Sequence, residues 1–172
     1  MPVLNLDDFY RDGSDRGMPR HAELGIIDWD DPRAWDADAA LEALVTICTA
    51  GTTDVPVYDL SQDRAVGERT FEVGDVAIFV AEGLFAGELV AGCREHGILA
   101  DAIVVYRKLW KNFARRLSRD LAERRKPPVT LLRRGRALMR AEREVVDRQI
   151  TLGCRPATAA EVRGTLGTLS RR

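Results

Sequence analysis

The chain has 172 residues, which is enough for one domain with a substantial core and too few for two domains of ordinary size. Its 45% hydrophobic and 31% charged residues are typical of a water-soluble globular protein, and no apolar run approaches the roughly 20 residues that span a bilayer. The first residues lack a basic stretch followed by an apolar one, so no secretory signal is predicted and a cytoplasmic location is expected.

The formal net charge of −1 conceals a strong asymmetry along the chain. Residues 1–106 carry 7 Lys and Arg against 21 Asp and Glu, whereas residues 107–148 carry 15 against 5. A long basic segment after an acidic one indicates either a phosphate-handling element or a face that binds polyanions.

Cysteines and histidines are few. Cys48, Cys93 and Cys154 are odd in number, far apart and without a CxxC pair, so we expect reduced, structural thiols. With only His21 and His96, the sequence does not favour a histidine-based zinc site or a catalytic triad.

The first part of the chain predicts a strand, a polar loop and a helix. Residues 2–6 form a short apolar run typical of a strand, and a segment rich in Gly, Asp and Arg follows at 11–32. Residues 36–51 predict a helix, because the start is acidic, the end is Gly51, and apolar residues fall on one stripe. That stripe consists of Leu41, Leu44, Val45 and Cys48.

Four further strands and a helix are predicted before the basic segment. Residues 54–60 and 69–73 indicate short strands, and 76–83 is nearly all apolar, as expected for a central parallel strand covered on both faces. A helix at 84–96 ends at a glycine, and a buried strand follows at 101–106.

Helical patterns dominate the remainder. A first basic helix begins near Lys108 and is broken by two prolines, and a second runs to about Ile150. Thr158 and Glu161 fit a capping box that starts a last helix. Strands alternating with helices of this length predict an α/β fold with a doubly wound parallel sheet, in one domain spanning residues 1–172.

Polar residues follow two of the predicted strands. Asp7 and Asp8 come after the first strand, and Glu82 ends the apolar strand. Ligands bind at the carboxyl ends of the strands in doubly wound sheets, where carboxylates can hold hydrated Mg²⁺ or accept a proton from a substrate hydroxyl. The alternative is that Asp7 and Asp8 only cap the segment that follows them.

The basic segment contains the stretch NFARRLSRDLAERRK. On a helix, Arg115 and Arg119 share one face, and Asp120 lies four residues from Arg116 and Arg124, while apolar residues occupy another stripe. Such a helix offers guanidinium groups for bidentate phosphate contacts. The alternative is a solvated face with i,i+4 ion pairs. Direct binding of nucleic acid is disfavoured, because one basic helical segment is no recognisable nucleic-acid motif.

These clusters, in this order, resemble the uridine kinase family of P-loop kinases over residues 3–126. LNLDDFYRDG is similar to the family's strand ending in Asp-x-Phe-Tyr, DWDDPRAWD to its aromatic-Asp-x-Pro-x-Ala-aromatic-Asp stretch, and VPVYDLSQDRAV to its Pro-x-Tyr-Asp segment. VAIFVAEGLFA resembles its strand ending in Glu-Gly, and FARRLSRDLAERR its arginine-rich lid helix. The resemblance implies a P-loop kinase fold with a helical basic lid at about residues 107–128.

The resemblance also implies roles for individual residues. Asp7 would be the base that accepts the proton of the acceptor hydroxyl, and Glu82 would help to hold Mg²⁺, directly or through water. Residues that would line the nucleoside pocket are Tyr10, Trp29, Asp30, Tyr58 and Arg64. Residues of the lid that would close over the phosphates of ATP are Arg115, Arg116 and Arg119.

Two features depart from the family pattern. The segment YDLSQDR is one residue shorter than its counterpart and has Gln62 and Asp63 where a nucleoside-contacting histidine is expected. The acceptor therefore stays open between a pyrimidine nucleoside and another small molecule with a hydroxyl group. The second departure is that the GxxxxGK[ST] loop, which cradles the phosphates of ATP, does not occur in the sequence.

In the family the phosphate-binding loop precedes the Asp-x-Phe-Tyr strand, so the loop, its strand and one helix would lie before Met1. We therefore expect a chain with weak or no ATP binding and no turnover by itself. A missing strand would expose an apolar sheet edge, so association into homo-oligomers is also expected.

Three functional interpretations follow from the sequence. The first is an N-terminally truncated, ATP-dependent phosphotransferase that moves the γ-phosphate to a hydroxyl of a nucleoside or similar small molecule. The second is a degenerate, non-catalytic relative that acts as a binding domain. The third is an unrelated α/β protein whose basic helices bind nucleic acid or another polyanion.

Overall fold

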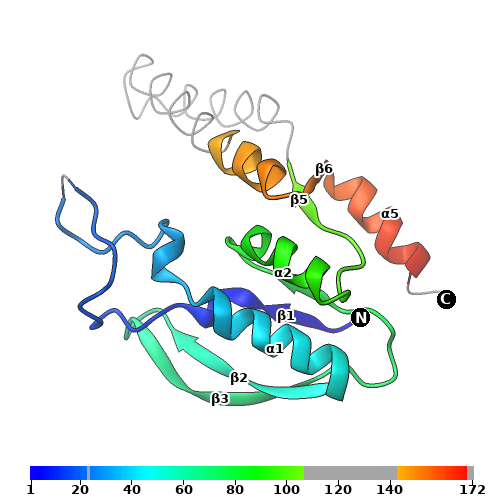
Figure 1. Cartoon of the computed structure of the whole chain (residues 1–172), viewed down its shortest axis with the longest axis horizontal. Helices are drawn as coiled ribbons and strands as arrows, with labels where there is room; N and C mark the ends of the chain where they lie inside the picture. The colour runs from blue at the N-terminus through cyan, green and yellow to red at the C-terminus, as the bar shows by residue number, and fades with distance from the viewer. Residues whose placement is uncertain (23, 107–142, 170–172) are drawn as a thin grey trace, which may run out of the picture. The chain divides into compact units, whose positions relative to one another are not determined.

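The computed structural model describes residues 1–22, 24–106 and 143–169, and the chain divides into two compact units, Met1–Ala102 and Ile103–Arg172 (Figure 1). Both units combine helices with parallel strand pairs, so the predicted α/β class with parallel strands is confirmed. The single domain expected for the whole chain stays a prediction, as does the doubly wound arrangement of its sheet.

The first unit is built on a parallel strand pair. Strand β1 (Val3–Asn5) lies beside β4 (Val80–Glu82), with Asn5 opposite Glu82. The parallel pairing expected for the apolar strand is therefore confirmed, but the strand is shorter than predicted and is not buried on both faces. Within the described part of the chain, β1 is the only strand that pairs with β4.

A single 3₁₀ turn, η1 (Leu6–Phe9), follows β1 directly. Asn5 caps it, because its side-chain oxygen accepts the N–H of Asp7 at 3.1 Å. Leu6 and Phe9 are buried, and this places the two intervening carboxylates, half-buried, at the end of the strand pair.

The predicted helix of residues 36–51 is confirmed as α1 (Ala37–Ala50). Asp36 caps its start by accepting the N–H of Ala39 at 3.0 Å, and Gly51 ends it with φ of 77°. The predicted apolar stripe is wrong in part, because Cys48 is exposed. The buried face consists of Ala40, Ala43, Leu44 and Ile47.

Leu41, a residue of the predicted stripe, lies against a glycine of the next helix. A Cβ built on Gly92, in helix α2 (Val90–Glu95), would lie only 2.6 Å from Leu41 Cδ2, so α2 packs directly on this side of α1. Helix α2 follows the 3₁₀ turn η3 (Ala86–Leu89) and ends near Gly97, as predicted.

The two short strands predicted at 54–60 and 69–73 form a long hairpin, β2 (Thr52–Asp59) and β3 (Arg64–Glu72), drawn beside α1 in Figure 1. The hairpin is antiparallel, unlike the parallel sheet that the sequence predicts. The reason is its four-residue connection, since parallel strands need a crossover of a dozen or more residues. The ladder changes register between Val57 and Tyr58.

The core of the first unit gathers residues from β1, η1, α1, both strands of the hairpin, η3 and α2, and from the loops between them. Trp35, which follows the 3₁₀ turn η2 (Pro32–Ala34), is buried and donates its ring N–H to the Leu6 carbonyl at 2.7 Å. This bond joins the polar loop to η1 across the core. The core residues are Leu4, Leu6, Phe9, Trp35, Ala40, Ala43, Leu44, Ile47, Val55, Phe71, Phe85, Leu89 and Cys93.

The second unit contains the parallel pair β5 (Ile103–Val105) and β6 (Arg155–Ala157). The strand predicted to be buried is present as β5, but Val105 is 51% exposed. Residues 143–151 are helical, which agrees with the predicted end of the second basic helix, and the first basic helix lies outside the described residues.

Helix α5 (Ala159–Leu169) begins at the predicted capping box. A carboxylate oxygen of Glu161 accepts the N–H of Thr158 at 2.6 Å, and the Thr158 hydroxyl accepts the N–H of Glu161 at 3.4 Å. The described residues include no helix with the length and apolar character to cross a membrane.

Candidate functional site

Asp7 lies where β1 and β4 end together. Its Oδ1 accepts the N–H of Leu84 at 3.0 Å. A Cβ on Gly83 would lie 2.8 Å from that same oxygen, so only glycine lets the backbone after β4 pass so close to the carboxylate. Asp7 and Glu82 thus stand at neighbouring strand ends, as predicted. Asp7 is not the cap of its own segment, because Asn5 fills that place.

Asp8 points to a different element. Its Oδ1 accepts the N–H of Tyr58 at 3.3 Å, and its Oδ2 lies 3.5 Å from Arg69 Nη2. The two consecutive carboxylates of η1 therefore contact different partners, the backbone after β4 through Asp7 and the hairpin through Asp8.

An aromatic cluster lies next to these carboxylates. The Tyr10 ring is 5.7 Å from Trp29, 5.9 Å from Tyr58 and 5.9 Å from Phe85, measured between centroids. Trp29 and Tyr58 are also in edge contact at 6.4 Å. The polar loop, the hairpin and η1 therefore meet at the three rings that the resemblance assigned to the acceptor pocket.

Both tyrosine hydroxyls of this cluster donate to backbone carbonyls. Tyr10 donates to Trp29 O at 3.2 Å, and Tyr58 donates to Arg11 O at 3.2 Å. With their protons engaged in this way, the hydroxyls offer a ligand mainly their acceptor lone pairs.

The surroundings of the tyrosines are acidic. Burial raises the pKa of Tyr10 to about 12, assisted by the negative charges of Asp7 and Asp30. Burial likewise raises the pKa of Tyr58 to about 12, with further contributions from Asp63 and Asp12. Because each carboxylate disfavours a second negative charge nearby, both phenols stay neutral at physiological pH.

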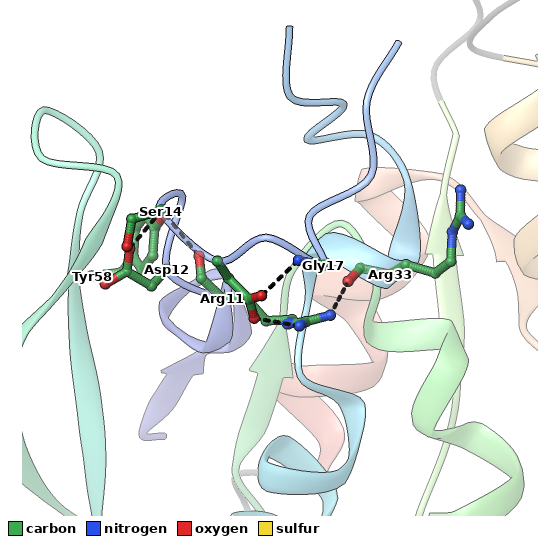
Figure 2. Close-up of polar contacts among 7 residues, drawn as sticks. Arg11, Asp12, Ser14, Gly17, Arg33 and Tyr58 are labelled. Carbon is green, nitrogen blue, oxygen red and sulfur yellow. Dashed lines mark hydrogen bonds and ion pairs between the residues drawn. The ribbon is translucent and has the colours of Figure 1, made fainter. Parts of the chain in front are cut away.

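Arg11 connects the polar loop to this site, and the sequence analysis did not single it out. Its Nη1 donates to the Arg33 carbonyl at 3.1 Å, and its Nη2 forms an ion pair with Asp15 (Figure 2). Asp15 also accepts the N–H of Gly17 at 2.7 Å. The sequence does show many Asp, Gly and Ser residues in this loop. Such loops are commonly held by hydrogen bonds from Asp and Ser side chains to the backbone two residues further along the chain.

The same loop touches the hairpin tip. The Gly13 N–H donates to the Asp63 carbonyl at 2.7 Å, and a Cβ on Gly13 would lie 2.9 Å from Asp63 Cβ. Asp12 accepts from both the N–H and the hydroxyl of Ser14, drawn in Figure 2, and these bonds lower the pKa of Asp12, helped by the charge of Arg64.

The hairpin tip is held by its own hydrogen bonds. Asp59 accepts from Ser61 and, at 2.6 Å, from Gln62 Nε2, and these bonds lower the pKa of Asp59 to about 2. Gln62 Oε1 in turn accepts from Arg64 at 3.0 Å. Where the family pattern has a histidine, this chain has a glutamine engaged within the turn.

The structure thus brings together Asp7, Tyr10, Trp29, Asp30 and Tyr58. Arg64 lies at the hairpin tip, and Glu82 is exposed at the end of β4. The lid residues Arg115, Arg116 and Arg119 lie outside the described residues.

A protein cage for a metal ion is absent from residues 1–22, 24–106 and 143–169, where no three His, Cys, Asp or Glu side chains cluster. Mg²⁺ does not require such a cage, since it keeps several waters and binds through one or two carboxylates and substrate phosphates. Glu82 and Asp7, at adjacent strand ends, fit that kind of shared site.

Comparison with known families decides the relationship. The model of the Phosphoribulokinase / Uridine kinase family matches residues 4–151. The chain belongs to this family. Similar proteins include the uridine kinase of Deinococcus deserti, 33% identical over 133 residues, which cover 76% of this chain and 59% of that protein.

Other relatives match more distantly or over a shorter stretch. The uridine kinase of Limosilactobacillus reuteri is 25% identical over 122 residues, covering 71% of this chain and 53% of the relative. The inorganic pyrophosphatase TTM1 of Arabidopsis thaliana is 31% identical over 86 residues, covering 49% of this chain and 12% of that protein. The chain therefore spans between about half and three-fifths of the length of these uridine kinases.

Proposed function

We propose that the chain carries the acceptor-binding and proton-accepting side of an ATP-dependent phosphotransferase. The acceptor is a hydroxyl group of a nucleoside or a similar small molecule. The observation that carries the proposal is the position of Asp7, a carboxylate at the end of a parallel strand pair beside three aromatic rings, in a member of a kinase family.

Asp7 is proposed as the base. Phosphoryl transfer needs alignment and charge stabilisation more than covalent help, and the carboxylate accepts the hydroxyl proton as the phosphate arrives. The hydrogen bond from Leu84 N–H fixes one carboxylate oxygen in place.

The acceptor is proposed to lie against Tyr10, Trp29 and Tyr58. Flat rings bind a nucleobase or a sugar face through apolar contact, while Asp30 and Arg64 supply polar contacts at the margin. Because the carboxylates near the tyrosines make this region acidic, a neutral acceptor suits it better than an anion.

ATP and Mg²⁺ complete the proposal. Glu82 would hold the metal ion together with the phosphates, directly or through water. Arg115, Arg116 and Arg119 would supply the positive charge that closes over the transferring phosphate. The sequence contains no GxxxxGK[ST] motif, so the cradle for the β- and γ-phosphates needs residues beyond those that we assign.

The test measures phosphate transfer from ATP to a panel of nucleosides and small alcohols. Two proteins are compared, the 172-residue chain and a form extended by the in-frame sequence upstream of Met1 where that sequence encodes GxxxxGK[ST]. We expect transfer by the extended form and little or none by the chain alone. Acceptor-independent ATP hydrolysis, or no transfer by the extended form to any acceptor, would overturn the proposal.

The absence of the phosphate-loop motif also supports a second candidate, an acceptor-binding domain without turnover. For this candidate, calorimetry would detect binding of a nucleoside to the chain and no binding of ATP. Sequencing of the gene would show an in-frame stop codon shortly upstream of Met1. A polyanion-binding protein would instead bind an oligonucleotide with an affinity that falls steeply with salt.

A further inference from the structure

Two contacts from Asp8 attach the hairpin β2–β3 to the candidate site. Tyr58 N–H donates to Asp8 Oδ1 at 3.3 Å, across 50 positions of sequence, and Arg69 Nη2 lies 3.5 Å from Asp8 Oδ2. The Asp8 side chain is 16% exposed and that of Arg69 is 42% exposed, so the carboxylate is the more enclosed partner.

Arg69 faces the core side of a strand that is otherwise exposed. It stands opposite the fully buried Val55 in the ladder, and its guanidinium carbon lies 5.9 Å from the centroid of the Phe71 ring. Residues two apart on a strand share a face, so Arg69 points the same way as the buried Phe71. The Arg69 side chain is still 42% exposed, so its guanidinium keeps much of its hydration, and on this face Asp8 is the carboxylate that pairs with it.

The second contact falls at an irregularity in the ladder. The register of the hairpin shifts between Val57 and Tyr58, and such bulges commonly redirect side chains beside functional sites. Here the redirected residue is Tyr58, whose ring lies 5.9 Å from Tyr10 and 6.4 Å from Trp29. Asp8 therefore holds the backbone of the residue that completes the aromatic cluster.

We propose that Asp8 is a positioning residue that, together with Arg69, holds the hairpin so that the Tyr58 ring faces the acceptor next to Asp7. The kinetic consequence rests on the phosphotransfer proposed above, whereas the structural consequence does not. The two adjacent carboxylates of η1 then have separate roles. Asp7 accepts the proton, and Asp8 positions the Tyr58 ring against the acceptor.

The structural consequence is tested by amide hydrogen exchange in the 172-residue chain. In Asp8→Ala we expect the Tyr58 amide to exchange about tenfold faster than in the unmodified chain, because a hydrogen bond to a charged acceptor is lost. The Val55 amide of the same strand should keep its rate. Equal acceleration of both amides, or of neither, would overturn the positioning role.

Two further variants separate the contacts. Asp8→Asn keeps an oxygen that can accept the Tyr58 N–H but loses the ion pair with Arg69. The Tyr58 amide of this variant should therefore exchange faster than in the unmodified chain and more slowly than in Asp8→Ala. Asp54→Ala is the matched control, because Asp54 accepts from the Thr70 hydroxyl at 2.7 Å within the same hairpin. It should leave the Tyr58 exchange rate unchanged.

The kinetic consequence is measured in the form that transfers phosphate. Asp8→Ala and Arg69→Gln should each raise KM for the acceptor about tenfold with a smaller change in kcat, because a displaced Tyr58 ring binds the acceptor less well. Arg69→Lys, which keeps the charge, should restore most of the lost affinity, and Asp54→Ala should match the unmodified enzyme.

A fall in kcat at constant KM in Asp8→Ala would place Asp8 in the chemical step and overturn the proposal. If the unmodified protein transfers no phosphate to any acceptor, the proposed function fails, and the amide exchange of Tyr58 alone decides the positioning role.

Discussion

The candidate site is assembled from two regions that are held in different ways. The strand-end segment, residues 4–10, has Leu4, Leu6 and Phe9 in the core. The hairpin, residues 52–72, buries only Val55 and Phe71, and residues 60–70 are all exposed. The first region contributes Asp7 and Tyr10, and the second contributes Tyr58.

The difference shows that the residues of the site are not held equally rigidly. Packing around η1 leaves Asp7 little freedom, which suits a group that must meet a hydroxyl within hydrogen-bonding distance. The hairpin has few buried apolar contacts, and regions of that kind open and adjust at lower free-energy cost. Changes in the strand-end segment should therefore affect chemistry and stability, and changes in the hairpin should affect the acceptor.

The largest effect is expected at Asp7. In the form that transfers phosphate, Asp7→Asn should lower kcat by about 10²–10⁴-fold, the usual contribution of a general base. Asn keeps an oxygen that can accept the Leu84 N–H, so the midpoint of urea unfolding should change little. Steady-state kinetics with denaturation as the control checks both statements, and a near-normal kcat would show that Asp7 is not the base.

The next effect concerns the backbone beside Asp7. Gly83→Ala should lower the free energy of unfolding by roughly 1–3 kcal/mol, because the new Cβ would lie 2.8 Å from Asp7 Oδ1 and 3.0 Å from Leu6 Cβ. The control is Gly67→Ala in β3, where a Cβ meets nothing within 4 Å. Urea unfolding of the two variants compares the regions directly, and equal stability changes would contradict the contrast between them.

The sequence predicted the strand-end segment well because its signals are local. An apolar run followed by paired acids gives the strand and its polar end, and an acidic start and Gly51 bound α1. The contacts of Asp8 could not be predicted, because Tyr58 and Arg69 are distant in sequence and meet Asp8 only through the hairpin. The antiparallel pairing of the hairpin was also not predicted, because the residues of two short strands do not show whether the strands pair in parallel or antiparallel.

A third prediction uses the tyrosines, one from each region. Tyr10 and Tyr58 should ionise only near pH 12, followed by the ultraviolet absorbance of tyrosinate. Both folded-state pKa values exceed the unfolded value of about 10, so the folded chain binds these protons more tightly. Their contribution to stability is complete below about pH 10 and is lost as the pH rises towards 12.

Asp7→Asn sharpens the comparison of the tyrosines. Removing that charge should lower the pKa of Tyr10, for which Asp7 is a cause after burial. The pKa of Tyr58 should not fall, because burial, Asp63 and Asp12 are unchanged and earlier ionisation of Tyr10 can only raise it. Tyr10→Phe and Tyr58→Phe assign the two transitions. A downward shift of both pKa values would mean that Asp7 acts directly on Tyr58 as well.

The smallest effect on stability is expected at the hairpin tip, which is held by local hydrogen bonds and not by buried side chains. Asp59 should stay ionised until the pH falls to about 2, because Ser61 and Gln62 donate to its carboxylate. With the folded pKa below the unfolded one, this contribution is present above pH 4 or so and is lost as the pH falls through 2. Carbon NMR of the Asp59 carboxyl group follows its protonation as the pH falls. Gln62→Ala should raise the pKa of Asp59, because one of the hydrogen bonds to the carboxylate is lost.

Leu60→Ser provides the control at the same tip. Leu60 is 81% exposed, so its replacement should change the free energy of unfolding by less than about 0.5 kcal/mol and leave the Asp59 titration as it was. A loss above about 1 kcal/mol would mean that Leu60 is covered in solution, by a second copy of the chain or by another protein. The tip would then be anchored by burial, and its contrast with the strand-end segment would disappear.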